Sequence, residues 1–418
     1  MKPLTINEWQ ALDANSRSDW RQRIEAELSD CIEITNTSAF SRRTLERTES
    51  ESSRNQVLSG LPYAVKDLFN LAGHPTHASS ILPILLERSA SEDAAIVQRM
   101  QQLGGCCVAK TQMNEFAYGL SGENPHYGDC PHPKLPDCLS GGSSSGSAYA
   151  VAAGYLPLAF GTDTGGSIRL PSAWCGIYGI RWTPGYYMQG AMPLAQSFDT
   201  MGWFTRTADE MATVIAAWFE LEASPHTSPI SGRAFFPQHL LTPESHKATV
   251  QLAEKLELTI EQDMPRLSAL LEPCQLAFNV LQSQEAYQFH HEWLEKYGAN
   301  YDPKVKARIL RGQAWTEAEV QTAQDTRLQI RNWFDAYFCE HDYLAMPICP
   351  GPTLPVDQAS PKLREQTLQL TTAASLAGLP ALSVPVWIDS TRSVGIQFIF
   401  KDPTPTVPLA LLDLCKSI

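Results

Sequence analysis

Two glycine- and serine-rich turns stand close together in the sequence, and each carries hydroxyl groups that could act as nucleophiles. The first turn is SGGSSSGS at residues 140–147, and the second is TGGS at residues 164–167. The small residues between the turns predict a helix followed by a strand. A helix and a returning strand bring the chain back to its starting level, and α/β sheets carry their sites in turns at strand ends. The spacing therefore predicts that serines of both turns meet in one site.

Three known motifs overlap these turns, and each lacks part of its required context. Residues 142–146 match G-x-S-x-G, the nucleophile elbow that would make Ser144 the nucleophile, but a proline-rich segment replaces the strand that must precede it. Residues 163–165 match the D-T-G of aspartic proteases, which need a second such aspartate, and the chain has no second D-T-G or D-S-G. Neither turn continues into the G-K-[ST] of a phosphate-binding loop. Simple tight turns would explain the glycines but not the serines crowded beside them.

Lys66 could supply the base that a serine nucleophile needs. A serine hydroxyl is a weak nucleophile at neutral pH, and Ser-Lys enzymes activate it with a neutral amine in place of imidazole. Lys66 stands in GLPYAVKDLFN (residues 60–70), an apolar run that predicts a buried strand. Burial disfavours the ammonium form, so it would lower the lysine pKa from its ordinary value of about 10.4. A lysine beside an aspartate is more often paired at the surface, so this assignment depends on the two serine turns.

The segment GGSSSGSA, followed by GTDTGGSIRLPSAWCG, resembles the amidase signature. Weaker similarity to the amidase signature family extends from GLPYAVKD at residue 60 to AGLPALSVPVW and VGIQFI near the C-terminus, and so covers most of the chain. The resemblance implies an α/β/α sandwich around a mixed central sheet. It also implies hydrolysis of an amide or a related carbonyl compound through a serine acyl-enzyme, without a cofactor or a metal.

The resemblance assigns roles to individual residues of a Ser-cisSer-Lys triad. By position, it implies that Ser167 is the nucleophile, that Ser143 after a cis peptide bond passes the proton, and that Lys66 is the base. It implies an oxyanion hole formed by the backbone N–H groups of Thr164, Gly165, Gly166 and Ser167. The positions that would order the second turn by hydrogen bonding, with ordinary turn capping as the alternative, are Ser144, Asp163 and Arg169.

The sequence departs from the family pattern in two places, and its loops offer candidates for a pocket. Ser145 stands where the family often has glycine, a variant that does not put activity in doubt. Arg181-Trp182-Thr183 replaces the usual Lys-Pro-Thr, which we expect to alter a structural turn, whereas the sequence leaves the effect on the pocket open. Aromatic residues near the motifs could line the substrate pocket, with core packing as the alternative: Phe116, Tyr118, Trp174, Tyr187 and Trp203.

The sequence leaves open both the substrate within the family and two other functional classes. The segment MPLAQSFDTMGWFTRT (192–207) resembles plant-type indole-3-acetamide hydrolases and related bacterial amidases, which implies a small-molecule amide as substrate and water as second substrate. Carbamates, allophanate and aryl esters are alternatives within the same family. Two alternatives belong to other classes: a catalytically silent amidase fold that binds proteins, and an A-type subunit of a tRNA amidotransferase, which NEFAYGLSGEN (114–124) resembles.

Periodicity indicates the elements that must position these residues. Strand, helix and strand follow one another over residues 60–111, which is typical of an α/β sheet, and strands return near the C-terminus. We expect a single domain over residues 1–418. Its parts would be an N-terminal helical segment (1–56), the signature core (57–205), a helical elaboration (206–340), and C-terminal strands and a helix (341–418).

Composition and net charge narrow the classes of partner that the protein is expected to bind. A net charge of −13 disfavours binding to nucleic acid or an anionic membrane, because both are polyanions. The chain shows no leader and no apolar run of transmembrane length, so we expect a cytoplasmic protein. Its ten cysteines form no C-x-x-C pair and are expected to be reduced thiols rather than metal ligands. A homodimer remains an open alternative.

Overall fold

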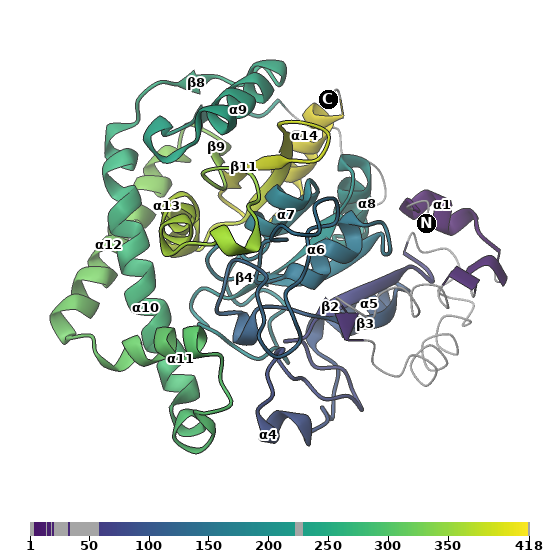
Figure 1. Cartoon of the computed structure of the whole chain (residues 1–418). Coiled ribbons are helices and arrows are strands. Elements are labelled where there is room, and N and C mark those ends of the chain that lie inside the picture. Colours follow the sequence, from purple (N-terminus) through teal and green to yellow (C-terminus); the bar gives the residue numbers. More distant parts are fainter. Residues whose placement is uncertain are drawn as a thin grey trace.

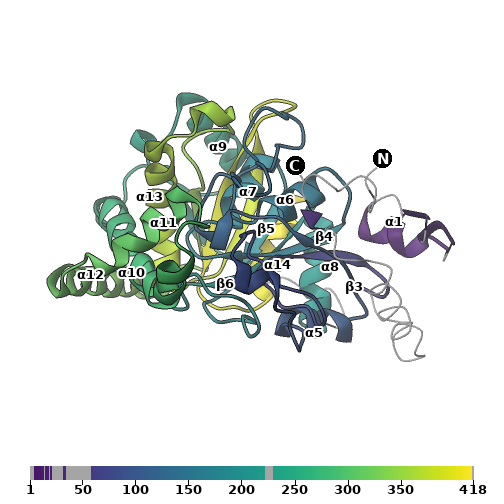
Figure 2. The ribbon, with the colours of Figure 1, turned by 60° about the horizontal axis from the view of Figure 1, so that its bottom comes forward.

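The fold is a mixed β-sheet with helices on both faces (Figures 1 and 2). The computed structural model describes residues 4–13, 15–17, 19–20, 32–33, 58–221 and 229–416. The predicted α/β/α architecture around a mixed central sheet is confirmed over these residues. Helix α1 (Ile6–Ala11) belongs to the predicted N-terminal helical segment, most of which lies outside the described residues.

Eleven strands of the described chain form one sheet. In spatial order they are β1 (Ile32–Glu33), β3 (Cys106–Thr111), β2 (Pro62–Lys66), β4 (Leu158–Asp163), β6 (Thr200–Thr205), β5 (Tyr178–Arg181), β10 (Ala381–Trp387), β11 (Ser393–Phe400), β9 (Tyr343–Pro347), β7 (Gly232–Phe235) and β8 (Ile260–Glu261). Strand β2 runs parallel to β3 and β4, and β7 runs parallel to β8 and β9, whereas the other neighbours are antiparallel. All residues of β2, β4, β5 and β6 are buried, because helices cover the sheet on both faces.

Consecutive residues of β6 show the two covering layers. A Cβ atom on Gly202 would lie 3.1 Å from the side chain of Ile168, at the start of α7 (Arg169–Cys175). The ring of Trp203 points to the opposite face and packs 5.3 Å, between centroids, from Trp218 of α8 (Ala208–Trp218). Successive side chains of a strand point to opposite faces, so α7 and α8 belong to different layers. Figure 2 shows α6 (Ser145–Ala152) beside α7, with α5 (Ala95–Gln102) and α14 (Thr406–Cys415) on the side of α8.

A group of helices packs together beside the sheet (Figure 1). It consists of α10 (Pro265–Tyr297), α11 (Pro303–Leu310), α12 (Glu317–Tyr337) and α13 (Pro361–Ala377). Side chains at their first residues stabilise these helices: Thr316 and Glu319 form a capping box at α12, and Ser360 accepts from the backbone of Leu363 at α13. Helix α13 ends at Gly378, whose φ of 76° is the left-handed conformation that glycine adopts without strain.

Residues 206–340 contain more than the predicted helices. They include α8, α9 (Pro243–Lys255), α10, α11 and α12, but also the two strands β7 and β8 at the edge of the main sheet. These strands have four and two residues, so they are too short for the alternating pattern by which a strand is recognised in a sequence. This region therefore extends the sheet as well as carrying the helices beside it.

Two further findings concern membrane-spanning helices and cysteines, for which the composition gave expectations. No helix in the described part of the chain combines the length and the apolar character needed to cross a membrane. All nine cysteines among the described residues are free thiols, and seven of them are buried. The tenth, Cys31, lies outside the described residues.

Candidate active site

Lys66 ends strand β2 and is completely buried. Its Nζ lies 2.7 Å from Oγ of Ser143 and 2.8 Å from Oγ1 of Thr162, so both hydroxyls are within hydrogen-bonding distance of the amine. Burial lowers the pKa of Lys66 to about 7, although the carboxylates of Asp199 and Asp163 act in the opposite direction. A large fraction of this amine is therefore neutral at physiological pH and can accept a proton.

Ser143 lies in the first serine turn, directly before α6, and the peptide bond that joins Gly142 to Ser143 is cis. The neighbouring Ser144 connects this turn to the strand that leads to the second turn. Its hydroxyl donates to the carbonyl oxygen of Thr162 at 3.1 Å and accepts from the Thr162 amide at 3.3 Å. The Ser144 amide donates to the carbonyl oxygen of Ser167 at 3.3 Å. The structure thus brings the two turns together, as the spacing predicted.

The close approach of the turns depends on Gly161 in strand β4. A Cβ atom at this position would lie 2.6 Å from Oγ and 2.7 Å from Cβ of Ser144, and 2.9 Å from the side chain of Ile168. Contacts this short do not occur between real atoms, so any larger residue would separate the turns. Glycine is therefore required here by the space between the two turns rather than by backbone conformation.

The second turn follows β4 and is anchored at each residue. Thr164 donates from Oγ1 to Asp199 at 2.6 Å, the Gly165 carbonyl accepts from Thr371 Oγ1 at 2.6 Å, and the Gly166 amide donates to Asp163 at 2.8 Å. Ser167 stands at the end of this anchored turn, 3% exposed, two residues before the start of α7. The Gly166 N–H, one of four candidates for the oxyanion hole, therefore already has an acceptor in Asp163.

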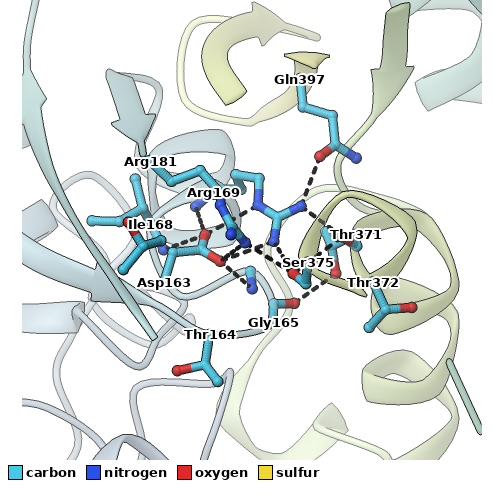
Figure 3. A network of polar contacts seen from close by, with 12 residues as sticks. Asp163, Thr164, Gly165, Ile168, Arg169, Arg181, Thr371, Thr372, Ser375 and Gln397 are labelled. Atoms are coloured by element: carbon cyan, nitrogen blue, oxygen red, sulfur yellow. Dashed lines mark hydrogen bonds and ion pairs between the residues drawn. The ribbon is translucent and has the colours of Figure 1, made fainter. Parts of the chain in front are cut away.

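Asp163 is the centre of a buried ionic network (Figure 3). Its carboxylate accepts from Nη2 of Arg169 at 2.9 Å and from Nη1 of Arg181 at 3.0 Å, and none of the three side chains is exposed. It also accepts from the backbone amides of residues 166, 168 and 169. Burial alone would raise the pKa of Asp163, but the two guanidinium groups and the amides hold it well below its usual range. The carboxylate is therefore charged and fixes the start of α7.

Arg169 extends this network to the C-terminal part of the chain. Its Nη1 donates to the Thr371 carbonyl at 2.7 Å and to Oε1 of Gln397 at 2.8 Å, and its Nη2 donates to Oγ of Ser375 at 2.9 Å. Helix α13 and strand β11 are thereby attached to the turn that carries Ser167 (Figure 3). The predicted supporting positions Ser144, Asp163 and Arg169 all order the two turns in this way.

Residues of the departure at 181–183 contribute to the core around Asp163. Arg181 lies in β5 and supplies the second guanidinium of the Asp163 network, together with a hydrogen bond to Ser375. The Trp182 ring is buried against Trp203 and Phe219. None of the three residues lines the cavity described next, so the replacement alters the core around Asp163 rather than that rim.

A cavity of about 390 Å³ lies against α7 and α13. Of the five aromatic candidates, Trp174 lines it. The structure places the other four in hydrophobic clusters: Phe116 and Tyr118 pack in a cluster with Tyr301, whereas Tyr187 packs on Trp218 and Trp203 packs on Phe160. A sequence does not distinguish these two uses of aromatic residues, because core and pocket positions have the same composition.

Sequence reasoning missed several residues that contact the site: Thr162, Arg181, Asp199, Thr371, Ser375 and Gln397. Thr162 directly precedes Asp163, and strand geometry could have placed it near Lys66 once β2 and β4 were known to be neighbours. Burial raises the pKa of Asp199 to about 6, against the hydrogen bonds that it accepts from Thr164 and from the backbone. Its position directly before β6 was the one available signal. Among the described residues, no cluster of three or more His, Cys, Asp or Glu is arranged to hold a metal ion.

Comparisons with known proteins place this fold and site in a family. A family model described as Amidase matches residues 21–252 and 241–402. Over 376 residues the chain is 28% identical to Translocon at the outer membrane of chloroplasts 64 of Pisum sativum, a match that covers 82% of this chain and 63% of that protein. It is 28% identical over 420 residues to Amidase 1 of Arabidopsis thaliana, covering 90% of this chain and 97% of that protein.

A crystal structure of an amidase superposes on this chain with a TM-score of 0.85, at 28% sequence identity and over 99% of both chains. The shared fold and the sequence matches together define a hydrolase that acts on carbon–nitrogen bonds. The chain belongs to the amidase family, the family of the amidase signature.

Proposed function

We propose that the protein hydrolyses an amide bond of a small molecule through an acyl-enzyme on Ser167. The observation that carries this proposal is the buried Lys66 amine, 2.7 Å from Ser143 and with a pKa lowered to about 7. A neutral amine in contact with a serine is the base that a Ser-Lys mechanism requires. Ser167 lies in the adjoining turn, where the hydrogen bond between Ser144 and Ser167 keeps the two turns in contact.

In the first half-reaction, Oγ of Ser167 attacks the substrate carbonyl carbon as its proton passes to Ser143, whose own proton passes to Lys66. The carbonyl oxygen becomes an oxyanion, which the backbone N–H groups of residues 164, 165 and 167 would stabilise. The Gly166 N–H can contribute in addition only if it shares or leaves its bond to Asp163. Lys66 then returns its proton through Ser143 to the leaving nitrogen, and the C–N bond breaks.

In the second half-reaction, water attacks the acyl carbon as its proton passes to Ser143, whose own proton passes to Lys66. The C–O bond to Ser167 breaks, Lys66 returns its proton through Ser143 to Oγ of Ser167, and the carboxylic acid leaves. Thr162 has a positioning role in this scheme, because its Oγ1 is the second hydroxyl at 2.8 Å from the Lys66 amine. All proton carriers come from the chain itself.

Labelling of Ser167 by a fluorophosphonate probe tests the proposed nucleophile. We expect stoichiometric labelling of the wild type, loss of labelling in Ser167→Ala, and retention in Ser145→Ala, a change in the first serine turn. Hydrolysis of primary amides, anilides, carbamates, allophanate and aryl esters by the same preparations then defines the substrate class. Labelling that persists in Ser167→Ala would assign the nucleophile to another residue.

The same experiment separates the enzyme from a catalytically silent binding protein. One similar protein bears the name of a chloroplast translocon component, which makes a binding role the alternative to test. A silent fold has no need for a lysine with a lowered pKa in contact with a serine. Absence of labelling and of turnover in the wild type would favour the binding protein.

A further inference from the structure

The cavity beside α7 adjoins the turn that carries Ser167. Leu170 and Trp174 line it from α7, and Leu170 is three residues beyond Ser167, about one helical turn. Thr367 lines it from α13, one turn before Thr371, which donates to the Gly165 carbonyl. The two helices that hold the second turn, α7 and α13, therefore also form part of the cavity wall.

Helix α10 also contributes residues both to the cavity wall and to the surroundings of the second turn. Asn279 lines the cavity and is adjacent in sequence to Phe278. The Phe278 ring lies so close to the second turn that a Cβ atom on Gly165 would approach it to 2.6 Å. Asn279 of the cavity wall and Phe278 at the second turn are therefore consecutive residues of α10.

The charged residues of the cavity wall are mainly cationic. The wall carries four cations and two carboxylates: Lys304, Arg308, Arg311, Arg364, Glu123 and Glu365. Lys304 forms an ion pair with Glu123 at 2.9 Å, which leaves three arginines and one carboxylate. The whole chain has a net charge of −13, so this excess of positive charge is a local feature and not a result of composition.

Arg364 carries a buried donor that the described residues leave without a partner. Its Nε is buried and finds no hydrogen-bond partner within the described part of the chain. Burial, followed by the proximity of Arg308 and Arg311, lowers the pKa of Arg364 to about 10, so its surroundings disfavour the cation. Arg308 itself is held by a hydrogen bond from Nη1 to the Tyr118 carbonyl. A bound anion would satisfy the free donor and offset the repulsion among the arginines.

We propose that this cavity binds a carboxylate of the substrate, so that the preferred substrates are amides that carry a carboxylate away from the scissile bond. Arginine guanidinium groups bind carboxylates with two parallel hydrogen bonds, and Arg364 and Arg311 supply such groups. Leu139, Leu170 and Trp174 provide an apolar wall for the carbon chain between carboxylate and amide. This inference specifies the substrate of the proposed amidase and rests on that proposal for its catalytic part.

Binding of adipate, a flexible dicarboxylate, tests the cavity without any need for turnover. We expect titration calorimetry to detect adipate binding to the wild type but not binding of dimethyl adipate, which has a similar carbon chain without charge. Arg364→Met should weaken adipate binding at least about tenfold, because a hydrogen bond to a charged group is lost. Arg266→Met, which removes an exposed arginine at the start of α10 that does not line the cavity, should leave it unchanged.

Equal binding of adipate and its dimethyl ester, or an Arg364→Met protein that binds adipate as the wild type does, would overturn the inference. A general effect of net charge would instead weaken binding in both arginine variants, and this result would also overturn it. Far-ultraviolet circular dichroism and the urea midpoint verify that Arg364→Met is folded. If that variant is unfolded, Arg311→Met, at an exposed position, replaces it and is expected to weaken adipate binding in the same direction.

Ammonia release from adipamic acid and from its methyl ester connects the cavity to catalysis. We expect kcat/KM to be at least about tenfold higher for the acid in the wild type, and this preference to disappear in Arg364→Met through a higher KM. Comparable turnover of both compounds would contradict the inference while leaving the proposed amidase intact. Adipate binding without turnover of any amide and without labelling of Ser167 would support the carboxylate site and contradict the proposed amidase.

Discussion

The amine of Lys66 illustrates how a single residue acquires its chemistry from its surroundings. In water this group holds a proton across the physiological range, whereas in the protein it lies among buried side chains and beside two hydroxyls. The loss of hydration destabilises the ammonium more than Asp163 and Asp199 stabilise it, and the pKa falls to about 7. The residue type alone would have given the opposite protonation state.

The pH dependence of catalysis follows from this pKa. Because Lys66, the proposed base, acts only when neutral, kcat/KM should rise with pH as a single ionisation with its midpoint near 7. Initial rates with an amide substrate between pH 5 and 10 measure this profile. A rate that does not change across this range would show that another group is the base.

The proton path gives a second prediction at the level of single residues. Ser143→Ala and Lys66→Ala should each lower kcat by about 10³-fold or more, and the double variant should be little slower than the worse single variant, because the two groups act as a unit. Single-turnover rates for the three variants measure this coupling. Ser145→Ala, whose hydroxyl donates a 3.4 Å hydrogen bond to the Gln112 carbonyl, serves as the matched control and should stay within a few-fold of wild type. If the fold-losses in kcat of the two single variants multiply in the double variant, Ser143 and Lys66 act on separate steps.

At the level of elements, the Asp163 network joins β4, β5, α7, α13 and β11. Removal of its one carboxylate would leave Arg169 and Arg181 buried together without a counter-ion. Breaking a buried pair on one side typically costs about 3 to 5 kcal/mol, much more than the loss of a surface pair.

We therefore expect Asp163→Asn to lower the free energy of unfolding by about 3 to 5 kcal/mol, measured by urea denaturation. The control is Asp389→Asn, which removes one partner of the exposed ion pair with Arg392 and should shift the urea midpoint little. Equal shifts in the two variants would mean that the buried network contributes nothing beyond an ordinary surface pair.

The elements also show which parts of the site a sequence can predict. Lys66, Ser143 and Ser167 stand in local motifs, and the strand pattern around them predicts the mixed α/β sheet that the structure has. Neither Gln397 of the Asp163 network nor Arg364 of the cavity wall could be found in this way, because their places depend on the packing of distant segments. For a related reason, the sequence could not distinguish pocket-lining from core positions among the aromatic candidates. Whether Trp174 or Trp203 faces a cavity depends on the layer that covers it.

At the level of the whole molecule, the buried lysine influences stability. Its pKa of about 7 in the folded protein lies below the value of 10.5 expected in the unfolded chain. Between these two pH values the unfolded state binds a proton that the folded state lacks, so folding becomes more favourable as pH rises through this window. The cost of burying Lys66 is complete below pH 7 and disappears above about pH 10.5.

Lys66→Met should remove this contribution. We expect the free energy of unfolding of the variant, relative to wild type, to be highest near pH 7 and to fall by about 1.4 kcal/mol per pH unit toward pH 10. Urea titrations at pH 7, 8, 9 and 10 measure this difference. Lys362→Met, a change at an exposed lysine of α13, should leave the wild-type slope in place, and the same slope in Lys66→Met would refute the linkage.

The hydrogen bonds from Arg169 to residues far along the sequence also determine when, during synthesis of the chain, the site can form. Its partners Thr371 and Gln397 lie 202 and 228 residues further along the chain. At about 5 to 20 residues per second, a ribosome needs roughly 10 to 45 seconds to add that stretch. Throughout this interval a nascent chain already contains Ser143, Ser167 and Lys66 but lacks the residues that attach the second turn to α13 and β11. The residues of the proposed triad are therefore synthesised well before Gln397, and the site can acquire its final geometry only after that residue has been added.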